Sequence, residues 1–166
     1  MKKRWICLFV ENEVGVLAKI SGLFSAKAYN VSSLTVGMTE DVTISRMTIS
    51  LMSDDQTFEQ IIKQLNRSVE VIKVIDYTNM PIHMEELMYI KVLKVTEKDK
   101  AEIFRITKVF EVKVIDMGKT SVLLKCSQTE EKNNSLLNLM KLEFTNRIEV
   151  ARGGSVAIEA INMPAD

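Results

Sequence analysis

Apolar residues recur with two different spacings along this chain. The spacings predict elements in the order strand, helix, strand, strand, helix, strand. A period of two indicates a strand with one buried face, and a spacing of three or four indicates an amphipathic helix. The first pass through this order predicts a helix from Val16 to Ala28. It predicts a second helix that Ser53-Asp54-Asp55 caps and whose apolar stripe runs from Phe58 to Leu65. The strands are predicted at Trp5–Val10, Val31–Met38, Val42–Met52 and Val69–Tyr77. The order is that of the split βαβ, or ferredoxin-like, motif.

The same order recurs in the second half of the chain. Helices are predicted from Glu97 to Phe110 and from Thr129 to Phe144. The last strand region contains Gly153-Gly154, a pair that fits either a bulge or a turn between two short strands. The strands are predicted at Leu87–Val95, Val112–Met117, Thr120–Cys126 and Arg147–Ile161.

These patterns predict an α+β fold with two ferredoxin-like βαββαβ domains in tandem. The residues of the two halves do not repeat obviously, so the duplication concerns architecture alone. Asn79-Met80-Pro81 breaks the strand pattern and indicates a linker. The predicted domains are 1–78 and 85–166, joined by a linker at 79–84.

Charge and composition argue against several classes of protein. Lys+Arg and Asp+Glu are equal at 22 each, and no basic stripe is present, so a nucleic-acid partner is not expected. No apolar run approaches the length of a membrane span, and the N-terminal apolar run ends at Glu11 without a small-residue cleavage site. We expect a cytoplasmic protein that has no membrane contact.

Patterns of catalytic and metal-binding residues are missing from the sequence. The single histidine, His83, lies in the predicted linker, and no Asp/Glu set has metal-ligand spacing. Cys7 and Cys126 lie far apart in strand patterns and are predicted to be buried, reduced thiols. The sequence therefore predicts no catalytic residue, no metal site and no cofactor in this chain, which lowers the prior for an enzyme.

The turn between the first strand and the first helix favours a binding role. Backbone N–H groups at a helix start, aided by the helix dipole, suit a carboxylate. Gly15 has no Cβ and lets a ligand approach the main chain, and Asn12 and Asn30 offer amide groups. The pattern predicts a small zwitterion with an apolar tail, such as a branched amino acid. Structural roles explain the same residues equally simply: Asn12 as a helix cap, Gly15 for close packing and Asn30 as a helix end.

The first strand is apolar on both faces. One face can pack on the helices, whereas Trp5, Cys7 and Phe9 point the other way and need cover. A second subunit is the simplest source of that cover. A homodimer through the first domain is therefore predicted.

Distinctive motifs occur in both halves of the chain. The first half contains E-N-E-V-G-V-L-A-K-I-S-G-L-F-S-A-K-A-Y-N-V-S-S-L-T-V-G (11–37), T-E-D (39–41) and S-R-M-T-I (45–49). The second half contains E-E-L-M-Y-I-K-V (85–92), V-F-E-V-K-V-I-D-M (109–117) and I-E-V-A-R-G-G (148–154). The first set closely resembles, and the second more loosely resembles, the small regulatory subunit family of acetolactate synthase, also called acetohydroxyacid synthase.

The resemblance implies that the first domain is an ACT domain, a ligand-sensing module, and that the chain has no catalytic activity of its own. It implies a catalytic subunit as partner, which this chain activates and which uses thiamine diphosphate and Mg²⁺, usually with FAD. That enzyme condenses pyruvate with pyruvate or 2-oxobutyrate at the start of valine, leucine and isoleucine biosynthesis. Feedback inhibition, most often by valine, is also implied.

The resemblance further places the effector at an ACT dimer interface. The turn after the first strand supplies main-chain contacts from one chain, and the asparagine before the second strand comes from the other chain. The matching residues are Asn12, Glu13, Val14, Gly15, Val16 and Leu17, with Asn30 and Val31 across the interface.

Three positions depart from the family pattern. Ala28 stands where glycine is usual, and a positive φ there would cost an alanine about 1 kcal/mol. Val42 stands where proline is common, and Cys126-Ser127 replaces a small, glycine-containing segment. The alternative function is a stand-alone amino-acid-sensing ACT module that regulates another partner. A transcriptional role would need a basic recognition helix, which the sequence does not show.

Overall fold

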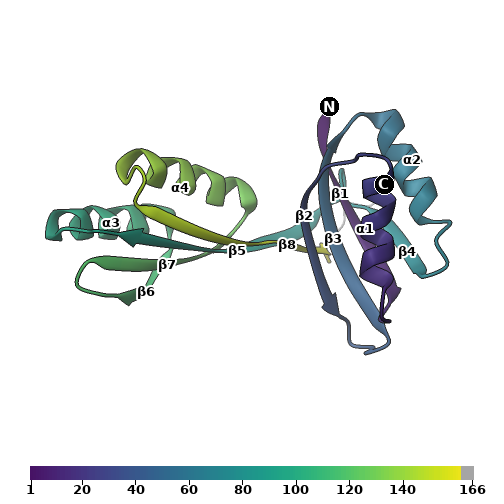
Figure 1. The fold of residues 1–166 in the computed structure, drawn as a ribbon, viewed down its shortest axis with the longest axis horizontal. Coiled ribbons are helices and arrows are strands. Elements are labelled where there is room, and N and C mark those ends of the chain that lie inside the picture. Colours follow the sequence, from purple (N-terminus) through teal and green to yellow (C-terminus); the bar gives the residue numbers. More distant parts are fainter. Residues whose placement is uncertain (162–166) are drawn as a thin grey trace. The chain divides into compact units, whose positions relative to one another are not determined.

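The computed structural model describes residues 1–161 and divides them into two compact units (Figure 1). One unit is Met1–His83 with the described residues from Val156 onward, and the other is Met84–Ser155. Each follows the order strand, helix, strand, strand, helix, strand around a four-stranded sheet. The α+β class and the tandem βαββαβ architecture predicted from the sequence are confirmed.

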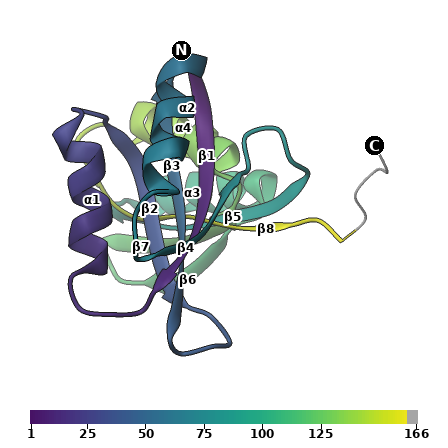
Figure 2. The same cartoon turned by 90° about the vertical axis from the view of Figure 1, so that its right-hand side faces the viewer.

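The first unit carries its two helices on one face of its sheet, as Figure 2 shows. The sheet order is β2-β3-β1-β4, with antiparallel neighbours throughout. Alternate residues of β1 and β3 meet the apolar stripes of both helices to form the core. The elements are β1 (Lys2–Glu11), α1 (Val16–Ala26), β2 (Val31–Met38), β3 (Ile44–Ser53), α2 (Asp55–Leu65) and β4 (Val71–Asp76).

The second unit repeats this plan with sheet order β6-β7-β5-β8. Its core joins alternate residues of β5 and β7 to the inner faces of the helices. The elements are β5 (Ile82–Leu93), α3 (Glu97–Phe110), β6 (Lys113–Met117), β7 (Ser121–Gln128), α4 (Glu130–Glu143) and β8 (Ile148–Glu159).

Two features near the unit boundaries differ in detail from the sequence patterns. β5 begins at Ile82, inside the segment 79–84 predicted as a linker, and the division at 78 and 85 stays a prediction. β8 runs without interruption through Gly153-Gly154, so the alternative of a turn between two short strands is wrong. Gly154 has a φ of +78°, which glycine adopts without steric strain.

The outer face of the first sheet is covered around Cys7 by the same chain. Cys7 is 0% exposed and interacts with Tyr77, which is itself buried. Arg46 donates hydrogen bonds to the Tyr77 hydroxyl, to the Ala157 carbonyl at 3.1 Å and to Glu159 at 3.2 Å. Cover at Cys7 therefore does not require a second subunit. The homodimer stays a prediction.

Candidate functional site

The turn that joins β1 to α1 is fixed to the β2–β3 hairpin. The Asn12 backbone N–H donates to the Thr43 carbonyl at 2.8 Å. The Asn12 side chain donates to the Val42 carbonyl at 2.8 Å and accepts from the Ser45 hydroxyl at 3.0 Å. Asn12 is therefore not the cap of α1, and the prediction of that role is wrong. Its amide instead locks the turn in place.

Helix α1 begins directly after Gly15, and the N–H groups at its N-terminus are not capped by a side chain. Gly15 is the N-cap with φ +88° and ψ −11°, a left-handed conformation that favours glycine. No side chain caps the helix, and its first turn contains no acidic residue, because Glu13 precedes the cap. Within residues 1–161, the N–H groups of Leu17 and Ala18 have no hydrogen-bond partner. These donors and the positive end of the helix dipole can receive an anion.

Space and charge around this turn suit a small zwitterion. A Cβ built on Gly15 would meet nothing within 4 Å, so the main chain is accessible there. Nearby, Glu70 forms an ion pair with Lys19 and raises the pKa of that ammonium, with smaller contributions from Glu11 and Glu13. The free main-chain donors complement the carboxylate of an amino acid, and Glu11 and Glu13 add negative charge near the turn.

The other end of α1 is shaped by a left-handed residue, Ala28, with φ +55°. The Ala28 N–H donates to the Ser25 carbonyl at 3.0 Å, and the Tyr29 N–H donates to the Phe24 carbonyl at 3.0 Å. This pair of bonds is a Schellman motif, and the Tyr29–Phe24 pair supplies its apolar contact. The positive φ considered from the sequence is confirmed. The helix-ending role considered for Asn30 belongs to Ala28 instead.

Asn30 and Val31 line a hollow beside α1, which we name the effector hollow. Its volume is about 290 Å³, and its wall is formed by α1, β2, the segment between them and Ile49 of β3. Its lining combines apolar core side chains with two serine hydroxyls and the Asn30 amide. The lining residues are Ile20, Ser21, Phe24, Ser25, Tyr29, Asn30, Val31, Leu34 and Ile49.

A single chain does not bring the two predicted halves of the site together. The turn lies at the start of α1, and Asn30 and Val31 follow its end. Since α1 has 11 residues, a rise of 1.5 Å per residue separates its ends by about 16 Å. That span exceeds the reach of a small amino acid, so the site is split within one chain.

Neither cysteine is an exposed thiol. Burial raises the pKa of the Cys126 thiol to about 11, which keeps it protonated near neutral pH. Cys7 is fully buried, and both cysteines are free thiols, as predicted. Within residues 1–161 no group of three His, Cys, Asp or Glu side chains could hold a metal ion. None of the helices in this range is long and apolar enough to cross a membrane.

Comparisons with known proteins agree with the motifs in both halves. Residues 6–73 match the AHAS small subunit-like ACT domain, and residues 85–161 match the small subunit of acetolactate synthase. An acetolactate synthase small subunit from Aquifex aeolicus is 39% identical over 158 residues, which span 95% of this chain and 81% of that protein. The chain belongs to the acetolactate synthase small-subunit family.

Other relatives of this acetolactate synthase small-subunit family member match most of its length. A probable acetolactate synthase small subunit from Archaeoglobus fulgidus is 39% identical over 94% of this chain and 96% of its own. The crystal structure of the acetolactate synthase small subunit from Thermotoga maritima superposes with a TM-score of 0.85 at 32% identity. That match covers 98% of this chain and 100% of the other.

Sequence reasoning missed two residues that shape the site of this family member. Ser45 holds the Asn12 amide, yet its motif S-R-M-T-I indicated a strand and a family resemblance and no contact with the turn. Glu70 accepts the Glu11 backbone N–H through its carbonyl at 3.0 Å and pairs with Lys19 through its side chain. Both contacts join segments more than 30 residues apart, so local patterns could not reveal them.

Proposed function

We propose that this chain is the non-catalytic regulatory subunit of an acetolactate synthase. It activates a catalytic subunit that uses thiamine diphosphate, Mg²⁺ and usually FAD, and those cofactors belong to that partner. A branched-chain amino acid, with valine as the first candidate, binds this chain and inhibits the holoenzyme. The single observation that carries the effector role is the open start of α1 at Gly15, where free N–H groups face solvent.

The split site supports a homodimer through the ACT domain. In a symmetric dimer the same patch of each copy meets the other. Two α1 helices that run antiparallel across such an axis place the turn of each copy beside Asn30 of the second copy. The effector carboxylate then binds the N–H groups of Leu17 and Ala18. Its apolar side chain enters the effector hollow, where Val31 is already partly buried.

Regulation follows from binding between two copies. An effector that contacts both copies binds the assembled arrangement more tightly than separated or rearranged copies, and it shifts the population accordingly. The same coupling free energy acts in reverse, so the catalytic subunit changes the affinity for the effector. Partner activation and effector response are therefore separable properties of one chain.

Three measurements test the proposal. The chain should co-purify with, and activate, the thiamine-dependent catalytic subunit of the same organism. Isothermal calorimetry with valine, leucine and isoleucine should then give heat with at least one of them, at one effector or fewer per chain. Absence of heat with all three leaves only the activating role. Sedimentation that shows a monomer at saturating effector would contradict the shared site.

A further inference from the structure

A second hollow lies on the helix-covered side of the first unit, between the end of α1 and the C-terminal half of α2. We name it the cationic hollow, and its volume is about 210 Å³. Every polar side chain that lines it carries a hydrogen-bond donor, and no carboxylate is among them. The lining residues are Lys27, Tyr29, Gln60, Lys63, Gln64 and Arg67.

The three cations around this hollow are available to a partner. Within the part of the chain that the structure describes, Lys27 and Arg67 form no ion pair. Lys63 pairs with Glu59 at 2.6 Å, but both side chains are about two-thirds exposed, and such pairs contribute little. A local excess of positive charge therefore stands on a chain whose net charge is zero.

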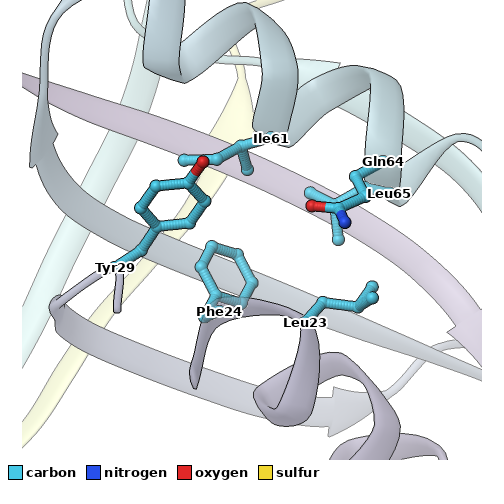
Figure 3. A pocket seen from close by; sticks show the side chains of 6 residues that line it. All are labelled: Leu23, Phe24, Tyr29, Ile61, Gln64 and Leu65. Carbon is cyan, nitrogen blue, oxygen red and sulfur yellow. The ribbon is translucent and has the colours of Figure 1, made fainter. Parts of the chain in front are cut away.

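An apolar depression adjoins the cationic hollow, and Figure 3 shows its side chains. Tyr29 and Gln64 line both features. The Tyr29 ring stands beside Phe24 in Figure 3, and its hydroxyl points toward α2 and Ile61. The full lining of the depression is Leu23, Phe24, Tyr29, Ile61, Gln64 and Leu65. Phe24, Ile61 and Leu65 are buried, so the surface between α1 and α2 combines the three cations with the partly exposed side chains of Leu23 and Tyr29.

We propose that this α1–α2 surface docks an acidic segment of the catalytic subunit that also carries an apolar side chain. The inference rests on the proposed function and adds the contact surface and its chemistry. Carboxylates of the segment pair with the cations, which gives charge complementarity and directs the encounter. The apolar side chain packs on Leu23 and Tyr29 at the rim of the depression, which is too shallow to receive it. A free anion such as phosphate would use the cations but leave these two side chains uncovered.

The position of this surface also connects it with the proposed effector site. Tyr29 lines the cationic hollow on one side and the effector hollow on the other. It directly precedes Asn30, and the Schellman motif at Ala28 fixes its backbone. A segment docked on α1 and α2 therefore contacts a wall of the effector hollow.

Charge reversal in the full-length chain tests this surface. The test variant combines Lys27→Glu, Lys63→Glu and Arg67→Glu. The control combines Lys119→Glu, Lys132→Glu and Arg105→Glu, which are exposed residues of the second unit. Both sets replace two lysines and one arginine, and Arg105 matches Lys63 because it pairs with a glutamate on its own helix. A third variant with glutamine at the three test positions removes the charges without reversing them. Circular dichroism checks that every variant is folded.

The dissociation constant for the catalytic subunit is measured for each chain over a series of salt concentrations. We expect the test reversal to raise it about tenfold or more and to flatten its salt dependence, with the control within twofold of the wild type. Wild-type affinity in the test variant, or an equal loss in the control, would overturn the inference alone. If the wild-type chain itself does not bind the catalytic subunit, the proposed function is wrong and the inference falls with it. Inorganic phosphate is titrated in parallel, and phosphate binding at these residues with unchanged subunit affinity would overturn the docking role.

Discussion

The first helices of the two units hold the same place in the fold but begin in opposite ways. Helix α1 starts at a left-handed glycine, with no side-chain cap and no acid in its first turn. Helix α3 starts with a reciprocal capping box between Thr96 and Asp99, and Glu97 adds a second acid to its first turn. The chain thus satisfies the N-terminus of α3 with its own groups and leaves that of α1 open to a ligand.

The two helix starts also differ in charge. Hydrogen bonds from the Thr96 N–H and from Arg147, at 3.0 Å, lower the pKa of Asp99 to about 2. A permanent carboxylate therefore sits on the dipole of α3. Capping residues stabilise a unit, whereas an open helix start forgoes that stability. The contrast supports the proposal that the effector binds at the turn of the first unit.

The largest expected effect comes from a charge placed at the open helix start. Gly15→Asp should weaken effector binding about a hundredfold or more, because its carboxylate repels that of the ligand and occupies the same donors. Gly15→Ala is the matched control, since it imposes the same strain at φ +88° without the charge. Calorimetry measures both affinities, and association with the catalytic subunit should be unchanged in both variants. Equal losses in the two variants would show that backbone strain, rather than the carboxylate, blocks the site.

Removal of the capping box should affect stability and leave effector binding intact. Thr96→Ala and Asp99→Ala should each lower the free energy of unfolding by about 1–2 kcal/mol, because a cap and a dipole contact are lost. Chemical denaturation measures this loss. Effector binding after either substitution should match the wild type within twofold. Binding of the effector at the uncapped start of α3 would contradict the assignment of effector binding to the first unit.

The same carboxylate predicts a dependence on pH. The folded-state pKa of Asp99 is lowered from its ordinary value of 3.8 to about 2. Its stabilisation is therefore complete above the ordinary pKa and is lost as the pH falls toward the folded value. Denaturation of the wild type and of Asp99→Asn between about pH 5 and pH 2 should show their difference in stability shrinking as pH falls. A constant difference would contradict the assignment.

The reverse change adds an acidic residue to the first turn of α1, and it should have a smaller effect. Ala18 is exposed and occupies the third position of α1, which corresponds to Asp99 in α3. Ala18→Glu should stabilise the chain by about 0.3–1 kcal/mol through the helix dipole and weaken effector binding about three- to tenfold. Ala18→Gln, similar in size but uncharged, is the control. Thermal unfolding and calorimetry provide the two readouts, and tighter effector binding by the glutamate variant would contradict the anion site.

The architecture was predictable because both units alternate their periodicities cleanly. Boundaries were less accurate where side chains form turns. β3 begins at Ile44 rather than Val42, since Asp41 accepts the Thr43 N–H at 2.9 Å and its carbonyl accepts the Ile44 N–H at 3.0 Å. Val69 is 89% exposed and precedes β4, although its apolar neighbours suggested a strand. Such turns depend on individual hydrogen bonds, which periodicity does not report.

The candidate site was predictable only in part. The open turn at Gly15 followed from local sequence, because helix starts and glycine have local signatures. The Asn12–Ser45 contact and the cationic hollow did not, since both join segments that only the tertiary fold brings together. Whether Asn12 to Leu17 and Asn30 with Val31 bind an effector stays a prediction, because the split geometry requires a second copy.

The smallest expected effect concerns the opposite ends of the same two helices, where the units agree. Ala28 and Glu111 both adopt left-handed conformations, with φ +55° and +56°, and both are exposed. Each precedes an N–H that bonds back into its helix, from Tyr29 to Phe24 at 3.0 Å and from Val112 to Thr107 at 3.1 Å.

Ala28→Gly and Glu111→Gly should therefore each stabilise the chain by up to about 1 kcal/mol. The relief of left-handed strain exceeds the added entropy of glycine in the unfolded chain, but only modestly. Urea denaturation measures both changes, and effector affinity should not change in either variant. A gain at Glu111 with a loss at Ala28 would mean that the Ala28 Cβ stabilises the end of α1 by packing. In that case the strain assigned to this departure from the family pattern would be wrong, and the two helix ends would differ as much as the two helix starts.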